Sequence, residues 1–139
     1  MVIMSVDLGK ARTGLAICDK SEMLASPLGM IEDRNLDRVA EKIASYVKDR
    51  KVEMLVIGLP KNMDGTEGES AQNARSFAQQ LEELCNIPTV MQDERGTTIT
   101  AHSFLNTTDT RGKKRKKVVD TVAATIILED YLNYRKNNR

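Results

Sequence analysis

Histidine, cysteine and tryptophan are scarce in this chain of 139 residues. It contains one histidine, His102, two cysteines and no tryptophan. Cys18 and Cys85 lie far apart in the chain and form no CxxC or Cys/His spacing, which excludes a structural zinc site. We expect both thiols to be small buried groups in a reducing compartment. The chain also lacks an arrangement of Ser, His or Cys that is typical of nucleophilic catalysis.

Long apolar runs are absent as well. No stretch approaches the ~20 residues that a membrane-spanning helix needs, and the chain reaches Asp7 before a signal-peptide core could form. We therefore expect a cytoplasmic, soluble protein without a membrane partner. The length fits one domain, residues 1–139, because single domains typically contain roughly 100–150 residues. This excludes machines that close one large lobe on another.

Positive charge is concentrated in one short segment. The chain has 21 Lys and Arg against 20 Asp and Glu, a formal net charge of +1. Without the six bases of residues 111–117, the remaining 15 bases face 20 acids, a net charge of −5. These six bases are Arg111, Lys113, Lys114, Arg115, Lys116 and Lys117. An acidic body with one basic segment indicates a polyanionic partner, although a solvated loop would have the same composition.

The hydrophobic patterns predict an α/β fold. Strands are predicted at 2–6, 15–18, 23–31, 54–57 and 89–91, and helices at about 35–50, 71–84, 98–105 and 118–134. Pro27 indicates an edge position or a bulge for the third strand. A three-stranded meander followed by crossovers implies a five-stranded mixed sheet with helices on both faces. Sites in such sheets form beyond the carboxyl ends of the central strands.

Acidic residues lie at two of these strand ends. Asp7 ends an uncharged strand, where a carboxylate needs compensation such as a bound divalent cation. A turn-starting aspartate that accepts hydrogen bonds from its own loop is the alternative. Asp93 and Glu94 close the fifth strand, and strand alternation lets only one of them face a given site. The other would pair with Arg95 or cap the next helix.

Asp120 belongs to the core-facing stripe of the last predicted helix. Positions 123, 124, 127, 128 and 131 of this stripe are Ala, Ala, Ile, Leu and Tyr. The carboxylate therefore points inward near a helix N-terminus, which favours negative charge; capping of that terminus is the alternative. Hard oxygen ligands suit Mg²⁺ or Mn²⁺, and such ions clamp the attacking and leaving oxygens in phosphodiester cleavage. The acidic set predicts a metal-dependent phosphoryl-transfer or nuclease site.

A glycine-containing loop, residues 58–68, follows the fourth strand at the same edge of the sheet. Its glycines permit close approach of a phosphate backbone, and Lys61 could pair with a phosphate, although turn formation alone explains Asp64-Gly65. The loop does not match a Walker A sequence. The spacing of Asp7, Gly9 and Gly14 is similar to the first phosphate loop of sugar kinases and actin-like ATPases, which need two such domains.

Four motifs in order give the chain a family resemblance. They are Val6-Asp7-Leu8-Gly9 with residues 12–16, residues 56–68, residues 93–98 and residues 116–124. With these motifs the chain resembles, over nearly its whole length, the YqgF family, also called RuvX. These are Holliday-junction-resolvase-like proteins with an RNase H-like fold. The resemblance implies a three-layer α/β fold and a nuclease that matures the 5′ end of 16S ribosomal RNA or, by analogy, resolves branched DNA.

The resemblance also implies roles for individual residues. It makes Asp7, Glu94 and Asp120 the catalytic, metal-binding carboxylates, with Asp93 as a less favoured stand-in. The residues that would contact phosphates or order the site are Arg12, Lys61, Asn62 and Arg95. Resolvases of this superfamily usually carry a carboxylate on the fourth strand, but this one ends in Gly58-Leu59-Pro60. Glu94 would therefore serve from the neighbouring strand.

We therefore predict a Mg²⁺- or Mn²⁺-dependent nuclease that acts on structured RNA such as pre-rRNA, with branched DNA as the second choice. The basic segment 111–117 would hold phosphates without reading sequence. Aromatic residues make up only 4% of the chain, so base-stacking platforms are scarce. A non-catalytic nucleic-acid-binding or ribosome-assembly module is the alternative. The sequence is compatible with a monomer or a homodimer.

Overall fold

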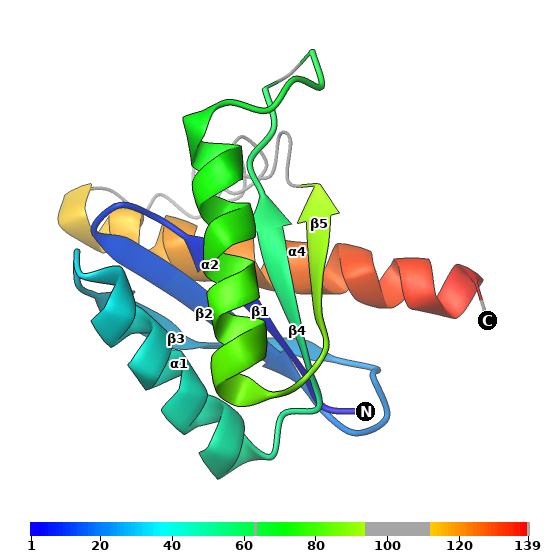
Figure 1. Ribbon diagram of the computed structural model, residues 1–139. Coiled ribbons are helices and arrows are strands. Elements are labelled where there is room, and N and C mark those ends of the chain that lie inside the picture. The colour runs from blue at the N-terminus through cyan, green and yellow to red at the C-terminus, as the bar shows by residue number, and fades with distance from the viewer. Residues whose placement is uncertain (63, 94–111, 139) are drawn as a thin grey trace.

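Five apolar segments pair into one mixed sheet that lies between helices (Figure 1). The computed structural model describes residues 1–62, 64–93 and 112–138, and for 112–120 the backbone only. The strands are β1 (Ile3–Leu8), β2 (Arg12–Cys18), β3 (Ala25–Glu32), β4 (Met54–Leu59) and β5 (Thr89–Asp93). The helices are α1 (Leu36–Arg50), α2 (Glu69–Cys85) and α4 (Gly112–Asn137). The helix predicted at 98–105 lies outside the described residues.

The order of the strands across the sheet is β3-β2-β1-β4-β5. The pairs β1–β2 and β2–β3 are antiparallel, whereas β1–β4 and β4–β5 are parallel. The carboxyl ends of β1, β4 and β5 therefore meet at one edge of the sheet. β3 is an edge strand and its pairing with β2 contains a register shift, so Pro27 occupies the kind of position that the sequence predicts.

Helices α1 and α2 cover one face of the sheet and α4 covers the other (Figure 1). Met4 and Val6 of β1 pack in the core beneath α1 and α2, whereas Ile3 packs beneath α4. This alternation gives β1 two buried faces, as expected for a central strand with a continuous apolar run. The predicted five-stranded sheet with helices on both faces is confirmed.

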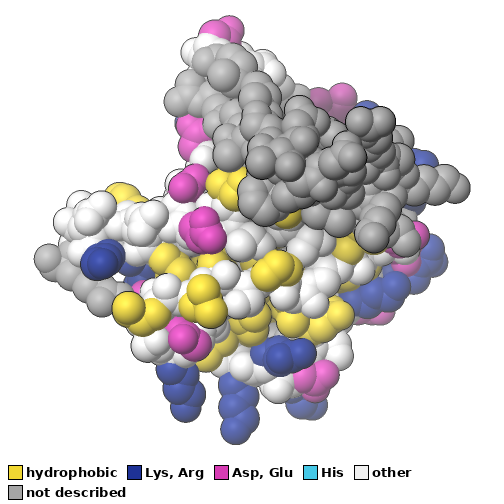
Figure 2. Space-filling model, turned by 180° about the vertical axis from the view of Figure 1, so that it is seen from behind, with side chains coloured by type: hydrophobic (Ala, Val, Ile, Leu, Met, Phe, Trp, Pro, Cys, Tyr) yellow, Lys and Arg dark blue, Asp and Glu magenta, His cyan; other side chains and the backbone are white. Residues whose placement is uncertain are grey.

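The buried stripe of α4 agrees with the prediction at every position whose side chain the structure describes. Its members Ala123, Ala124, Ile127, Leu128 and Tyr131 are all buried. The small alanines allow a close approach to β1, and the buried Ser5 Oγ donates a 2.6 Å hydrogen bond to the carbonyl oxygen of Ala124. Seen from the α4 side, hydrophobic side chains form small areas among polar and charged ones (Figure 2). Among the described residues no helix is both long and apolar enough to cross a membrane.

The basic segment does not form the predicted loop. We expected a loop over 111–117 and a helix from about Val118, but α4 already begins at Gly112. Residues 113–117 are therefore the first turns of this helix, while Arg111 lies outside the described residues. Lys and Arg are good helix formers, and the packed apolar stripe that follows gives the helix an anchor from which it extends toward its N-terminus.

The two cysteines differ in burial. Cys18 is buried, as predicted, but Cys85 is only half-buried, because it ends α2. Both are free, and burial raises the pKa of both thiols. Cys18 Sγ also accepts a hydrogen bond from the Ile3 amide at 3.3 Å. It therefore fills the core as a polarisable neutral group.

Glu22 joins the turn between β2 and β3 to the C-terminal part of α4. Its carboxylate accepts hydrogen bonds from Arg135 Nε at 2.7 Å and Arg135 Nη2 at 3.3 Å. The side chain of Glu22 is only 9% exposed. The hydrogen bonds from Arg135 lower the pKa of Glu22 to about 2, although burial opposes this shift. The pair therefore stabilises the docking of α4 on the sheet at neutral pH.

The variant Glu22→Gln should lower the free energy of unfolding by about 1–2 kcal/mol at pH 7. This is less than the pKa shift alone would give, because the Arg135 side chain is 26% exposed and solvent screens its charge. Since the folded-state pKa lies below the ordinary value of 4.5, the stabilisation is present above pH 4.5 and lost as the pH falls toward 2. Urea unfolding at pH 7 and pH 3 measures this. Glu41→Gln, at an exposed position of α1, is the control, and a pH-independent deficit in Glu22→Gln would contradict the assignment.

Candidate active site

Asp7 lies at the carboxyl edge of the sheet and on the face that α4 covers. Strand alternation gives Asp7 the same orientation as Ser5, whose hydroxyl reaches the Ala124 carbonyl of α4. Asp7 is half-buried near the end of β1, where it pairs with Gly14 of β2. A carboxylate is thus held on a rigid strand at the edge where sites form in such sheets.

Glycines flank Asp7 on both neighbouring strands. Gly14 is its partner on β2. On β4, the pairing of Val6 with Ile57 brings Gly58 alongside Asp7. Neither glycine has a side chain that could fill the space beside the carboxylate. The absence of a carboxylate at the end of β4, which the sequence analysis noted, therefore leaves room between β1 and β5 on the α4 face.

The two acidic residues at the end of the fifth strand are separated by this register. Asp93 pairs with Leu59, which alternates with Gly58 and so points to the α1/α2 side, away from Asp7. Gln92 pairs with Gly58 and lies in the row of Asp7, about 10 Å away across two strand spacings. Glu94 lies outside the described residues. The register therefore argues against Asp93 as a ligand beside Asp7.

The last helix carries Asp120 toward the same region. Asp120 lies four residues before Ala124 in α4, or about 6 Å along the helix axis. Because α4 begins at Gly112, Asp120 lies inside the helix, which excludes N-terminal capping of α4 as its role. Its side chain is outside the described part of the structure. The hydrogen bond from Ser5 to Ala124 thus joins the two elements that carry Asp7 and Asp120, two residues and one helical turn away from them.

The turn between β1 and β2 requires glycine at position 9. A Cβ atom on Gly9 would overlap the backbone carbonyl oxygen of Arg12. This close approach keeps the turn short and places Arg12 at the start of β2. Arg12 alternates with Thr13 and so has the same orientation as Gly14, toward the α4 side. The structure therefore brings Arg12 to the face and edge of Asp7.

The loop after β4 is ordered by its own polar side chains. Asn62 Nδ2 donates to Thr66 Oγ1 at 2.9 Å, and the Asn62 amide donates to the Thr66 carbonyl at 2.8 Å. Thr66 Oγ1 in turn donates to Asp64 Oδ1 at 2.6 Å, and Gly65 adopts a positive φ of 91°. Asn62 therefore orders the loop, and a phosphate contact by Asn62 remains a prediction. Lys61 lies half-buried at the start of this loop.

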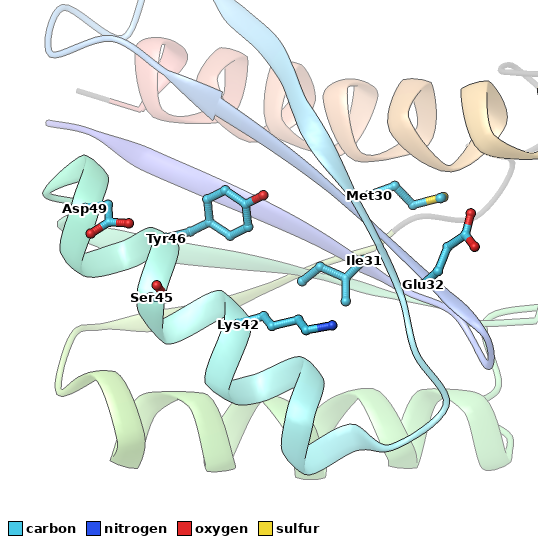
Figure 3. A pocket seen from close by; sticks show the side chains of 7 residues that line it. All are labelled: Met30, Ile31, Glu32, Lys42, Ser45, Tyr46 and Asp49. Carbon is cyan, nitrogen blue, oxygen red and sulfur yellow. The ribbon is translucent and has the colours of Figure 1, made fainter.

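A larger cavity lies elsewhere. It has a volume of about 460 Å³ and opens between the edge strand β3 and one side of α1 (Figure 3). Lys42 and Asp49 of α1 and Glu32 of β3 contribute charges of both signs to it. None of the predicted site residues lines this cavity. We therefore place the candidate site at the α4 face of the carboxyl edge.

Comparison with known proteins agrees with this geometry. A family model described as "RuvX: Holliday junction resolvase" matches residues 1–134. The chain belongs to the RuvX family. A protein of Shouchella clausii, provisionally named a pre-16S rRNA nuclease, is 43% identical over 135 residues, which are 96% of this chain and 95% of that protein. A protein of Caldanaerobacter subterraneus subsp. tengcongensis with the same name is 40% identical over 139 residues, 99% and 100% of the two chains.

Solved structures confirm the fold of this RuvX-family chain. Thermus thermophilus RuvC, in a complex with a Holliday junction substrate, superposes with a TM-score of 0.62 over 99% of this chain and 96% of that one. The sequence identity is 10%. The likeness therefore shows the fold alone, and this is the RNase H-like fold that the sequence predicts.

The side chains of the predicted metal site are only partly within the described structure of the RuvX-family chain. Among the described side chains, no three of His, Cys, Asp or Glu gather closely enough to hold a metal ion. Asp7 belongs to this described set, whereas Glu94, Arg95 and the side chains of Asp120 and of residues 113–117 do not. The donor at Asp7 is a hard carboxylate oxygen beside two glycines, which fits Mg²⁺ or Mn²⁺.

Sequence reasoning missed some of the residues that shape this site. Ser5, Gly14 and Gly58 appear in the apolar runs and family motifs without a role of their own. Two glycines on either side of one aspartate become visible only through the pairing of three strands. A polar Ser5 within an apolar strand, two residues before Asp7, was the available signal for a buried contact with another element.

Proposed function

We propose that this RuvX-family protein is a Mg²⁺- or Mn²⁺-dependent nuclease that hydrolyses a phosphodiester bond in the maturation of the 5′ end of pre-16S ribosomal RNA. The observation that carries the proposal is the placement of Asp7. This carboxylate stands between two glycines on the α4 face, and the Ser5–Ala124 hydrogen bond brings the Asp120-bearing helix to the same strand. The names of the relatives supply the substrate.

Asp7, Glu94 and Asp120 would hold the metal. Continued strand alternation beyond Asp93 would return Glu94 to the face of Asp7. Glutamate, with its longer side chain, suits the more distant strand. When bound, divalent ions activate water and stabilise the leaving oxygen. Three carboxylates near one another repel when no metal is present, and the dication offsets this repulsion.

The cations would serve the nucleic acid. Arg12 and Lys61 would pair with phosphates near the scissile bond, with Arg95 as a further contact. The bases of residues 111–117 would attract the backbone along the first turns of α4, and this attraction weakens with salt. We also propose that the protein acts in the cytoplasm, where bacterial ribosomal RNA is processed.

The test is metal-dependent cleavage of an RNA that spans the 5′ end of the 16S precursor. We expect cleavage with Mg²⁺ or Mn²⁺ and none in EDTA, with activity restored when the metal is added back. A parallel reaction with a four-way DNA junction tests the second candidate, which the family description "Holliday junction resolvase" favours. Metal-independent binding of either substrate without cleavage would instead indicate a non-catalytic assembly module and contradict the proposal.

A further inference from the structure

A small cavity lies on the opposite side of β1 from Asp7, at the same end of the sheet. Its volume is about 230 Å³ and it is lined by Leu8, Gly9, Lys10, Arg34, Leu36, Ser70 and Asn73. We propose that this Lys10–Arg34 cavity binds a backbone phosphate of the nucleic acid. The inference rests on the proposed function, because it assumes that a nucleic acid strand crosses this edge.

The two cations of the cavity come from segments that are joined to each other. Lys10 lies in the turn between β1 and β2, and Arg34 lies in the loop between β3 and α1. The amide of Asp33 donates a 3.0 Å hydrogen bond to the carbonyl of Ala11, one residue from each cation. Because this bond connects the two segments, the cavity is part of the folded framework.

The Lys10–Arg34 cavity is positive and has no carboxylate in its lining. The acids next to Arg34 are engaged elsewhere. Asp33 accepts hydrogen bonds from Arg38 at 2.8 and 3.0 Å, and Asp37 accepts one from Gln80 at 2.9 Å. Within the described part of the chain, Lys10 and Arg34 form no ion pair. Two cations that face one cavity without a counter-charge favour an anionic ligand.

The remaining polar groups suit a phosphate. Ser70 and Asn73 of α2 present a hydroxyl and an amide that make no hydrogen bond among the described residues. Lys provides a point charge and Arg a planar fork of donors, both of which bind phosphate oxygens. Pockets that enclose a whole small ligand usually measure about 300–1,000 Å³. At about 230 Å³, this cavity suits one group of a larger chain better than a complete nucleotide.

The position of the cavity fits a strand that continues from the candidate active site. Leu8, which lines the cavity, directly follows Asp7 and points to the opposite face of the sheet. Their Cα atoms are therefore only about 3.8 Å apart. A nucleic acid strand whose scissile phosphate lies at Asp7 would cross the end of β1 and place a neighbouring phosphate in the Lys10–Arg34 cavity.

The test compares two double variants that remove the same charge. Lys10→Ala/Arg34→Ala alters the cavity, whereas Lys48→Ala/Arg50→Ala removes two bases from the last turn of α1, at the other end of that helix. Fluorescence anisotropy measures binding of the pre-16S RNA and of a DNA junction at several salt concentrations, in Ca²⁺ to suppress cleavage. We expect the cavity variant to bind about tenfold more weakly, with a salt slope smaller by about 1.5, and the control to bind like wild type.

Each other outcome overturns the inference. Unchanged binding by the cavity variant, or an equal loss in the α1 control, would show that these two residues hold no specific phosphate. Wild-type protein that binds neither nucleic acid would have the same meaning. Titration with inorganic phosphate, followed by ³¹P NMR, would reveal a free-anion site if only this binding is lost in the cavity variant. The result is separable from the proposed function, because absence of cleavage leaves the binding comparison intact.

Discussion

Asp7→Asn should reduce metal-dependent cleavage of the pre-16S RNA by a factor on the order of 10³, which corresponds to about 4 kcal/mol of activation free energy. Asparagine keeps the size of the side chain but loses the negative charge that would hold the cation. Nucleic acid binding should stay within a few-fold of wild type, because the phosphate contacts lie elsewhere. The thermal midpoint should be unchanged or slightly higher without metal, because one like charge is removed from an acidic cluster.

Asp93→Asn is the matched control for this experiment. It makes the same chemical change at the same edge of the sheet, but Asp93 lies on the α1/α2 side of β5. We expect cleavage by Asp93→Asn within about threefold of wild type, as for a substitution outside the site. Cleavage rates and Mn²⁺ titration of both variants decide the matter. Equal losses in the two variants would contradict the assignment of faces, and an active Asp7→Asn protein would remove Asp7 from the metal site.

Most of the architecture could be predicted from periodicity. The continuous apolar runs of β1 and β4 correspond to central strands, and Pro27 corresponds to an edge strand with a register shift. The stripe from Ala123 to Tyr131 is buried as its spacing indicates. These features depend on local patterns that only one arrangement of strands and helices satisfies, which is why sequence alone reaches them.

The site was less accessible from sequence because it depends on register. Alternation shows that Asp93 and Glu94 oppose each other, but only the pairing of β4 with β5 shows which side Asp93 takes. Likewise, Lys10 and Arg34 belong to no motif and meet through a backbone hydrogen bond between two loops. The start of α4 was predicted too late, since a run of bases has the same composition in a loop and in a helix.

Gly9→Ala should have the largest effect on stability among single-methyl changes near the site. The added Cβ atom would overlap the carbonyl oxygen of Arg12, which is a backbone atom and cannot rotate away. The turn must therefore open, and we expect the free energy of unfolding to fall by about 2–3 kcal/mol. Because Asp7 lies two residues before the turn, its carboxylate should also shift. Displacements of about 1 Å can cost 10²-fold in rate, so cleavage by the folded variant should fall at least tenfold.

Gly68→Ala separates this steric effect from the general cost of replacing glycine. Gly68 precedes α2, with a φ of −95° that alanine can adopt. A Cβ atom there would meet only Asn62 Nδ2, at the ordinary contact distance of 3.9 Å. We expect Gly68→Ala to lose no more than about 1 kcal/mol, as alanine is a weaker N-cap residue than glycine. Urea unfolding and cleavage at a temperature where both variants are folded measure the difference. If Gly9→Ala matched Gly68→Ala in both, the tight turn would not be what holds Asp7 in place.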